Sequence, residues 1–98
     1  MTINQQKDGT VLTLALEGRL DTMTALQLEA ALQEALPGVK TLTFDLEKLD
    51  YVSSAGLRVL LSAQKTMNKQ GAMKVIHAND MVLEIFEITG FSDILTIE

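Results

Sequence analysis

Two segments of the chain have an apolar residue at every second position, and a helical pattern separates them. The segments are residues 10–16 and 41–46. A period of two is typical of a strand that buries one face, so both segments predict strands with a strongly apolar side. The apolar positions are Leu12, Leu14, Leu16, Leu42, Phe44 and Leu46.

Three further segments show helical spacing. A first apolar stripe follows Asp21 and Thr22, either of which can cap a helix, and stops at Pro37–Gly38. A long helix is expected from Ser53 to about Gly71. A third, capped by Asn79 or Asp80, is expected to end at Gly90. The residues expected to face inward are Ala25, Leu28, Leu32, Ala35, Leu57, Leu60, Leu61, Gln64, Met67, Val82, Ile85, Phe86 and Thr89.

The order of these patterns predicts an α/β fold. Residues 73–78 predict a short buried strand and residues 94–97 a last one, while residues 3–6 form the first arm of a hairpin. Strands alternating with helices give a single-layer, mixed and mostly parallel β-sheet with helices packed on it. We expect one domain, residues 1–98, with the strand from Thr41 in the centre of the sheet and the helix of residues 56–69 against it.

Composition excludes several classes of function. The chain has no cysteine, so it can form neither a disulfide nor a thiolate metal site, and its single histidine, His77, excludes sites that need two imidazoles. A formal net charge of -5 argues against a nucleic-acid partner. No apolar run is long enough to span a membrane, and residues 1–10 lack the pattern of a signal peptide. We expect a cytoplasmic protein without metal or cofactor.

The turn at residues 49–56 is the first candidate for a functional site. Carboxyl ends of parallel strands meet at one edge of a sheet, and α/β folds place their sites there. Ser53 and Ser54 lie at the start of the long helix, where free N–H groups would hold a phosphoryl group. Phosphorylation would add about -1.5 to -2 units of charge. The alternative is that both serines only cap the helix.

Three carboxylates, Asp45, Glu47 and Asp50, cluster near the same turn. Such groups can serve acid–base chemistry or hold Mg²⁺, but no nucleophile or phosphate-binding loop accompanies them. We therefore expect these three carboxylates to be solvent-exposed at the edge of the sheet, without a catalytic or metal-binding role. His77 closes a predicted strand, and the sequence offers no partner for it.

The segment Leu49–Leu61, LDYVSSAGLRVLL, resembles the signature of the STAS-domain anti-sigma factor antagonists. That signature has an apolar residue, then Asp, Ser, Ser or Thr, Gly and Leu, followed by an apolar helix. Residues 16–21 resemble the family's first motif, a strand ending in Gly-x-Leu-Asp, and residues 82–91 resemble its last helix. The resemblance spans nearly the whole chain.

The resemblance implies a phosphorylation site. In the family, a partner anti-sigma factor with serine kinase activity phosphorylates the first serine after the Asp, which here is Ser54. The family Asp falls on Ser53, and the second Ser or Thr falls on Ala55. The resemblance further implies that the chain supplies no catalytic residue of its own. The expected partner-binding residues are Asp21, Ser53, Ser54, Gly56 and Arg58.

Three functions are considered from these patterns and from the resemblance. The first is a regulatory module that binds an anti-sigma factor and is switched by phosphorylation of Ser54. The second is a constitutive STAS scaffold or subunit of a larger complex, in which Ser54 is only a helix cap. The third is a nucleotide-binding domain, which the lack of a phosphate-binding glycine loop makes weak.

Overall fold

A computed structural model describes all residues, 1–98, and forms a four-stranded mixed sheet in the order β1-β2-β3-β4. Strand β1 pairs with β2 antiparallel, and the other two pairs are parallel. The predicted fold class and the leading hairpin are thereby confirmed. The elements are β1 (Thr2–Asp8), β2 (Val11–Leu20), α1 (Thr22–Ala35), β3 (Thr41–Val52), α2 (Ser54–Gln70), β4 (Ala72–Ile76), α3 (Asp80–Thr89) and the short 3₁₀ helix η1 (Phe91–Asp93).

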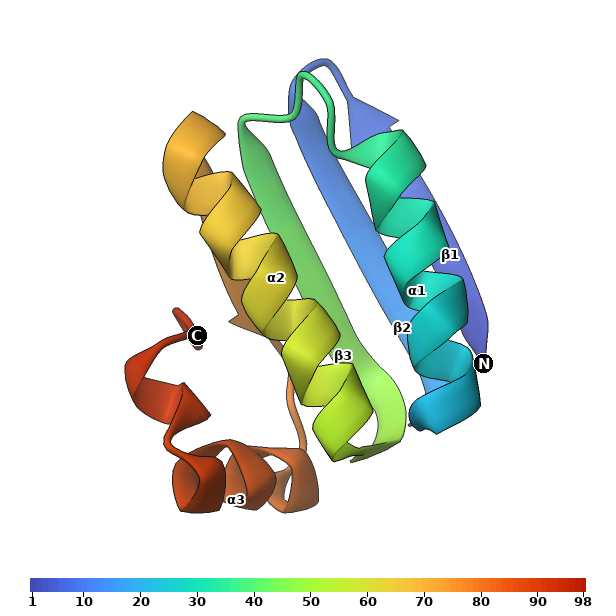
Figure 1. Ribbon diagram of the computed structural model, residues 1–98, viewed down its shortest axis with the longest axis vertical. Coiled ribbons are helices and arrows are strands. Elements are labelled where there is room, and N and C mark those ends of the chain that lie inside the picture. The colour runs from blue at the N-terminus through green and yellow to red at the C-terminus, as the bar shows by residue number, and fades with distance from the viewer.

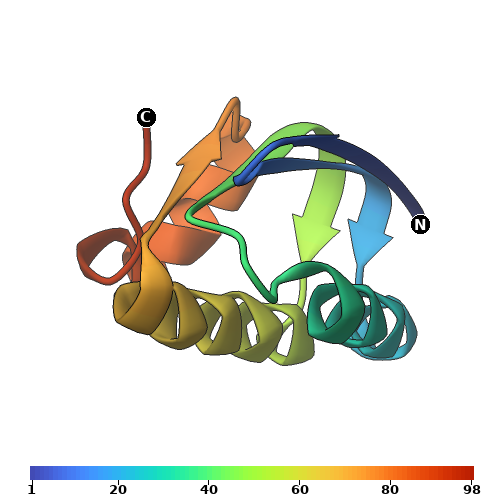
Figure 2. The ribbon, with the colours of Figure 1, turned by 90° about the horizontal axis from the view of Figure 1, so that it is seen from above.

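Helices α1 and α2 run side by side over one face of the sheet (Figure 1). Figure 2 shows them as one layer beneath the strands. Helix α3 packs against β3. Helices α1 and α2 each connect neighbouring parallel strands, and the strand order advances in the same direction both times. Because such crossovers have a fixed hand, both helices fall on the same face. The opposite face of the central strands has no helix over it.

The core lies between the sheet and these two helices. In the parallel register, Leu12 pairs with Leu42 and Leu14 with Phe44, so the apolar faces of β2 and β3 coincide. Phe44 is fully buried, as predicted. Leu61 differs from its prediction, because it is only half-buried. A helix buries a limited stripe, and the fully buried Leu60 occupies it.

Strands β2 and β3 extend further than the sequence pattern predicts. β2 continues through Gly18 to Leu20, and β3 continues to Val52. The register between the two strands shifts beside Gly18, whose φ of 103° suits glycine. This irregularity interrupts the apolar alternation, which is why the pattern ended too early. The extra length carries both strands to the same end of the sheet.

The prediction of a last strand at residues 94–97 is wrong. Gly90 adopts φ 81° and ends α3, and the chain then turns into η1. The chain reaches the sheet only as an isolated parallel bridge of Ile97 to Val75, held by backbone hydrogen bonds of Thr96 and Glu98 with Val75. Thr89 is exposed and does not face inward, since its hydroxyl donates to the carbonyl of Ile85 at 2.6 Å. None of the helices is both long and apolar enough to cross a membrane.

Gly71, which ends α2, lies against the backbone of Lys40. A Cβ at Gly71 would be 1.9 Å from the Lys40 carbonyl oxygen, whereas one at Gly56 would meet the Leu20 side chain at 2.6 Å. Backbone cannot move aside as a side chain can. We therefore expect Gly71→Ala to lower the free energy of unfolding by about 1–3 kcal/mol or more.

Gly56→Ala is the matched comparison for this prediction. Its clash is softer, and alanine gains about 1 kcal/mol over glycine within a helix. Urea denaturation of both variants should give the larger loss for Gly71→Ala. An equal or smaller loss would show that Gly71 is not tightly packed.

Candidate functional site

Strands β2 and β3 end side by side, and each leads directly into a helix. Leu20 pairs with Val52, and the Ser53 N–H donates to the Leu20 carbonyl at 2.8 Å. The N-termini of α1 and α2 therefore meet at one edge of the sheet. Each terminus carries unpaired N–H groups and a partial positive charge, so this edge favours anionic groups.

Asp21 caps α1. Its carboxylate accepts hydrogen bonds from the N–H groups of Met23 (3.1 Å) and Thr24 (2.9 Å). The Thr24 hydroxyl accepts from the Asp21 N–H at 2.8 Å and donates to the Arg19 carbonyl at 2.7 Å. The bond from the Thr24 N–H is the main cause that lowers the pKa of Asp21 below its ordinary value of 3.8. The capping role is confirmed, and the carboxylate remains half-exposed at this edge.

The lowered pKa of Asp21 gives a pH dependence of stability. Because the folded state favours the ionised carboxylate, its stabilising effect is complete above the unfolded pKa, close to 3.8, and is lost as the pH falls through the lower folded pKa. An asparagine at this position would still cap the helix but would not titrate. We expect the stability advantage of the wild type over Asp21→Asn to shrink below pH 3.8 in thermal unfolding. An advantage that is constant or grows on acidification would contradict this cause.

The two serines have different roles. The Ser53 hydroxyl accepts from the Gly56 N–H at 3.2 Å, and Ser53 is the half-buried N-cap of α2. Ser54 is the first residue of the helix, is exposed, and its hydroxyl makes no hydrogen bond. Capping therefore belongs to Ser53, and the Ser54 hydroxyl is exposed and makes no hydrogen bond within the chain.

Gly56 and Arg58 lie on different sides of the start of α2. Gly56 is buried against Leu20, so it allows α2 to approach β2 and is not itself a contact surface. Arg58 is exposed, with neither a hydrogen bond nor an ion pair. Of the predicted partner-binding residues, Asp21, Ser54 and Arg58 present side chains to solvent at this edge, Ser53 does so in part, and Gly56 supports them.

Sequence reasoning missed a pair beside the site. The Arg19 guanidinium lies 4.5 Å from the centre of the Tyr51 ring. The two residues are register partners, one position before Leu20 and Val52. Their equivalent places in the two strand ends could have revealed the pair. A cation above an aromatic face is a stabilising arrangement, and it adds a positive group to this edge.

His77 has a partner that the sequence did not reveal. Its Nδ1 lies 3.1 Å from Oδ1 of Asp45, because β3 and β4 pair in parallel with Asp45 opposite Ile76. Potential ligand atoms of Asp45, Glu47 and His77 lie within 4.8 Å of one another. The predicted grouping of Asp45 and Glu47 with Asp50 is corrected: His77 completes this group, on the sheet face opposite Phe44.

Comparison with known proteins agrees with this fold. The family model described as "Mlab, STAS domain" matches residues 3–96. BtrV of Bordetella bronchiseptica, a putative anti-sigma factor antagonist by name, is 36% identical over 99 residues, covering 99% of this chain and 85% of that protein. The anti-sigma-B factor antagonist of Listeria monocytogenes is 30% identical over 97 residues, covering 96% and 84%. The chain belongs to the STAS-domain family.

Solved structures share the fold at lower identity. An anti-sigma factor antagonist from Mycobacterium paratuberculosis superposes with a TM-score of 0.88 at 21% identity, covering 98% of this chain and 83% of that one. Unphosphorylated SpoIIAA superposes with a TM-score of 0.78 at 17% identity, covering 99% and 87%. SpoIIAA of Bacillus has also been solved in its phosphorylated form.

Proposed function

We propose that this chain is an anti-sigma factor antagonist whose binding to its partner is switched by phosphorylation of Ser54. The observation that carries the proposal is an exposed serine hydroxyl, without a hydrogen bond, at the N-terminus of α2. Relatives at 30% identity named anti-sigma-B factor antagonists support the role. The existence of SpoIIAA in both phosphorylation states supports the switch.

The unphosphorylated chain would dock the edge formed by Asp21, Ser54 and Arg58 onto an anti-sigma factor, which would then release its sigma factor. The anti-sigma factor would supply ATP and the catalytic groups. It would transfer the γ-phosphoryl group to Oγ of Ser54, with loss of the serine proton and release of ADP. This chain supplies the acceptor only, and we expect no hydrolysis of ATP or GTP by the chain alone.

The phosphorylated form would keep its fold and lose its partner. The N–H groups of Ser54 and Ala55 have no intrahelical acceptors, so they can bind phosphate oxygens. A charge of about -1.5 to -2 at the helix start suits the dipole. The same charge in a closely packed interface brings repulsion and a desolvation cost, which weakens docking.

Ser53 stands where the family signature has Asp. Asp and Ser are both favoured N-caps, so this difference preserves the local helix start. It removes a negative charge beside the acceptor, which makes the neighbourhood of Ser54 more favourable to a phosphoryl group. We therefore assign the switch to Ser54 with Ser53 as its structural support.

The test of this function is release of the sigma factor. The purified complex of the genomically associated anti-sigma and sigma factors is mixed with this chain and separated by size-exclusion chromatography. We expect free sigma factor and a new complex of the chain with the anti-sigma factor. An unchanged sigma complex would contradict the proposal and leave the scaffold function.

A further inference from the structure

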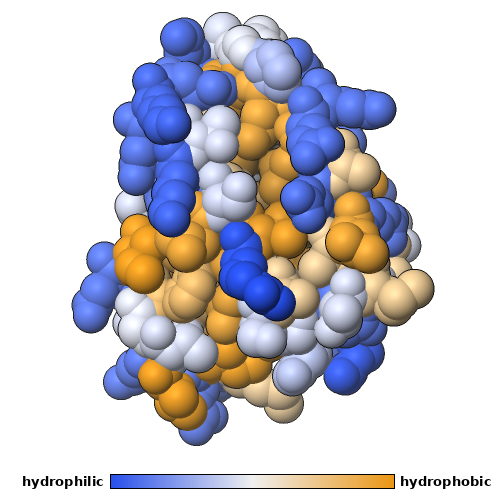
Figure 3. Space-filling view, viewed as in Figure 1, coloured by the Kyte–Doolittle hydropathy of each residue, from blue (hydrophilic) through white to orange (hydrophobic).

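A groove of about 600 Å³ separates α1 from α2 on the helical face of the molecule. Figure 3 shows it as an apolar floor between two polar ridges. Helix α2 contributes small side chains to the groove, such as Ala55, Ser62 and Thr66. The buried apolar residues that line it are Ala25, Leu32, Leu36, Val59 and Ala63.

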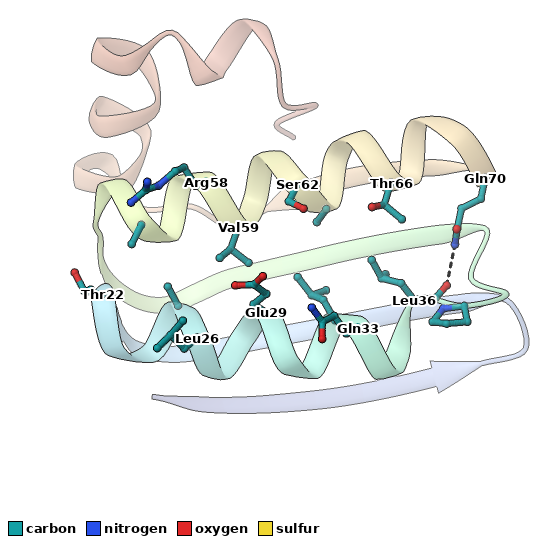
Figure 4. A pocket seen from close by; sticks show the side chains of 15 residues that line it. Thr22, Leu26, Glu29, Gln33, Leu36, Arg58, Val59, Ser62, Thr66 and Gln70 are labelled. Atoms are coloured by element: carbon teal, nitrogen blue, oxygen red, sulfur yellow. Dashed lines mark hydrogen bonds between the residues drawn. The ribbon is translucent and has the colours of Figure 1, made fainter.

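The two ends of the groove differ in chemistry. At the C-terminal ends of the helices, the Gln70 amide donates to the carbonyls of Leu36 (2.8 Å) and Val39 (2.7 Å) and closes the groove (Figure 4). At the other end lies Arg58, near Thr22 and the N-terminus of α2 (Figure 4). Gln70 thus blocks one end of the groove, and Arg58 places a positive charge at the other.

Arg58 has no anionic partner within the chain. The ion pairs in the structure are Lys48–Glu17 and His77–Asp45, so Arg58 is free to bind an anion. The partial positive charge of the α2 N-terminus lies at the same end, and its first turn contains no acidic residue. Glu29 on the opposite wall is the other charged residue of the groove. Because Glu29 repels added negative charge, a single carboxylate suits this end better than a multiply charged phosphate.

We propose that the groove binds a single-chain carboxylate amphiphile, such as a medium-chain fatty acid. The tail lies on the apolar floor and the carboxylate pairs with Arg58. Helix α1, with 14 residues, is about 21 Å long, so an extended alkyl chain fits between the two ends. The volume lies within the 300–1,000 Å³ typical of small-molecule sites. Closure by Gln70 opposes a partner helix, which would have to run through both ends.

The proposal is tested by titrating the isotope-labelled full chain with dodecanoate below its micelle-forming concentration. Amide signals are followed by heteronuclear NMR. We expect saturable shifts that map to the facing sides of α1 and α2. Dodecyltrimethylammonium, which has the same tail and a cationic head, should bind at least tenfold more weakly.

Two kinds of variant separate recognition of the head from recognition of the tail. Arg58→Met keeps a flexible, unbranched side chain without the charge and should weaken dodecanoate binding about tenfold, the usual scale for a lost charge-assisted hydrogen bond. Arg19→Met removes the arginine above Tyr51, outside the groove, and should leave binding unchanged. Thr66→Phe fills the groove and should abolish binding, and Ser62→Phe provides a second, more exposed obstruction.

Several results would overturn the proposal. These are no saturable binding below the micelle concentration, equal affinity for the cationic amphiphile, or full binding by Arg58→Met or by both filled variants. Binding of an amphipathic peptide to the groove in place of dodecanoate would assign it to a protein partner instead. The test does not use the anti-sigma factor, so its outcome is independent of the switch at Ser54.

Discussion

Replacing Phe44 with alanine is expected to lower the free energy of unfolding by about 3–5 kcal/mol, the usual cost of removing a large buried aromatic side chain. Phe44 is fully buried in β3, beside Leu14, beneath the two helices. The remaining cavity would be enclosed by both layers, which limits collapse around it. A domain of this size has about 5–15 kcal/mol of stability, so the variant would be partly unfolded at moderate temperature.

Phe91→Ala is the matched control for Phe44→Ala. Phe91 is half-buried at the start of η1, at the periphery of the core. The same deletion should therefore cost clearly less there. Chemical denaturation of both variants provides the comparison. A small shift in midpoint for Phe44→Ala, or a larger one for Phe91→Ala, would contradict the described core.

Ser54→Asp is expected to weaken binding to the anti-sigma factor at least tenfold while the fold is retained. The carboxylate imitates part of the phosphate charge at the exposed start of α2. Since that charge suits the helix dipole, stability should hold or rise by about 0.3–1 kcal/mol. Calorimetric titration measures the binding, and thermal unfolding measures the stability. Tight binding by Ser54→Asp would contradict the switch.

Alanine variants of Ser53 and Ser54 distinguish an effect on stability from an effect on partner binding. Ser53→Ala removes the N-cap bond to Gly56 and should cost about 0.5–2 kcal/mol of stability, without imitating phosphorylation. Ser54→Ala removes no hydrogen bond, so its stability should change by less than about 0.5 kcal/mol. It should stay bound to the anti-sigma factor in the presence of ATP, because it offers no acceptor.

Local patterns predicted the elements well where one chemical signal dominated. The apolar alternation around Phe44 identified a central strand, and Asp21, Ser53 and Asn79 were recognisable as candidate helix caps before the geometry was known. Such features depend on neighbours within a few residues. The sequence therefore contains their cause directly.

Features that depend on pairing between distant residues could not be predicted in the same way. The prediction of a last strand was wrong because η1 uses the residues after Gly90, so that the chain meets β4 only at an isolated bridge of Ile97 to Val75. The contact between His77 and Asp45 requires the parallel register of β3 and β4. The groove beside Arg58 depends on the spacing of two helices.

The two serines at the start of α2 illustrate what the sequence can and cannot predict. Sequence alone left either serine as the cap of α2. The hydrogen bond from Gly56 assigns capping to Ser53 and leaves the Ser54 hydroxyl free. Geometry thus distinguishes the residue that holds the helix from the residue that is open to modification.

The most direct test of the Ser54 switch is to map the phosphate itself. The chain is incubated with its genomically associated anti-sigma factor and Mg-ATP, digested, and analysed by mass spectrometry. Ser54→Ala serves as the parallel sample. We predict one phosphoryl group on Ser54 in the wild type and none in Ser54→Ala. Phosphate on Ser53, or no phosphate anywhere together with wild-type binding by Ser54→Asp, would contradict a switch at Ser54.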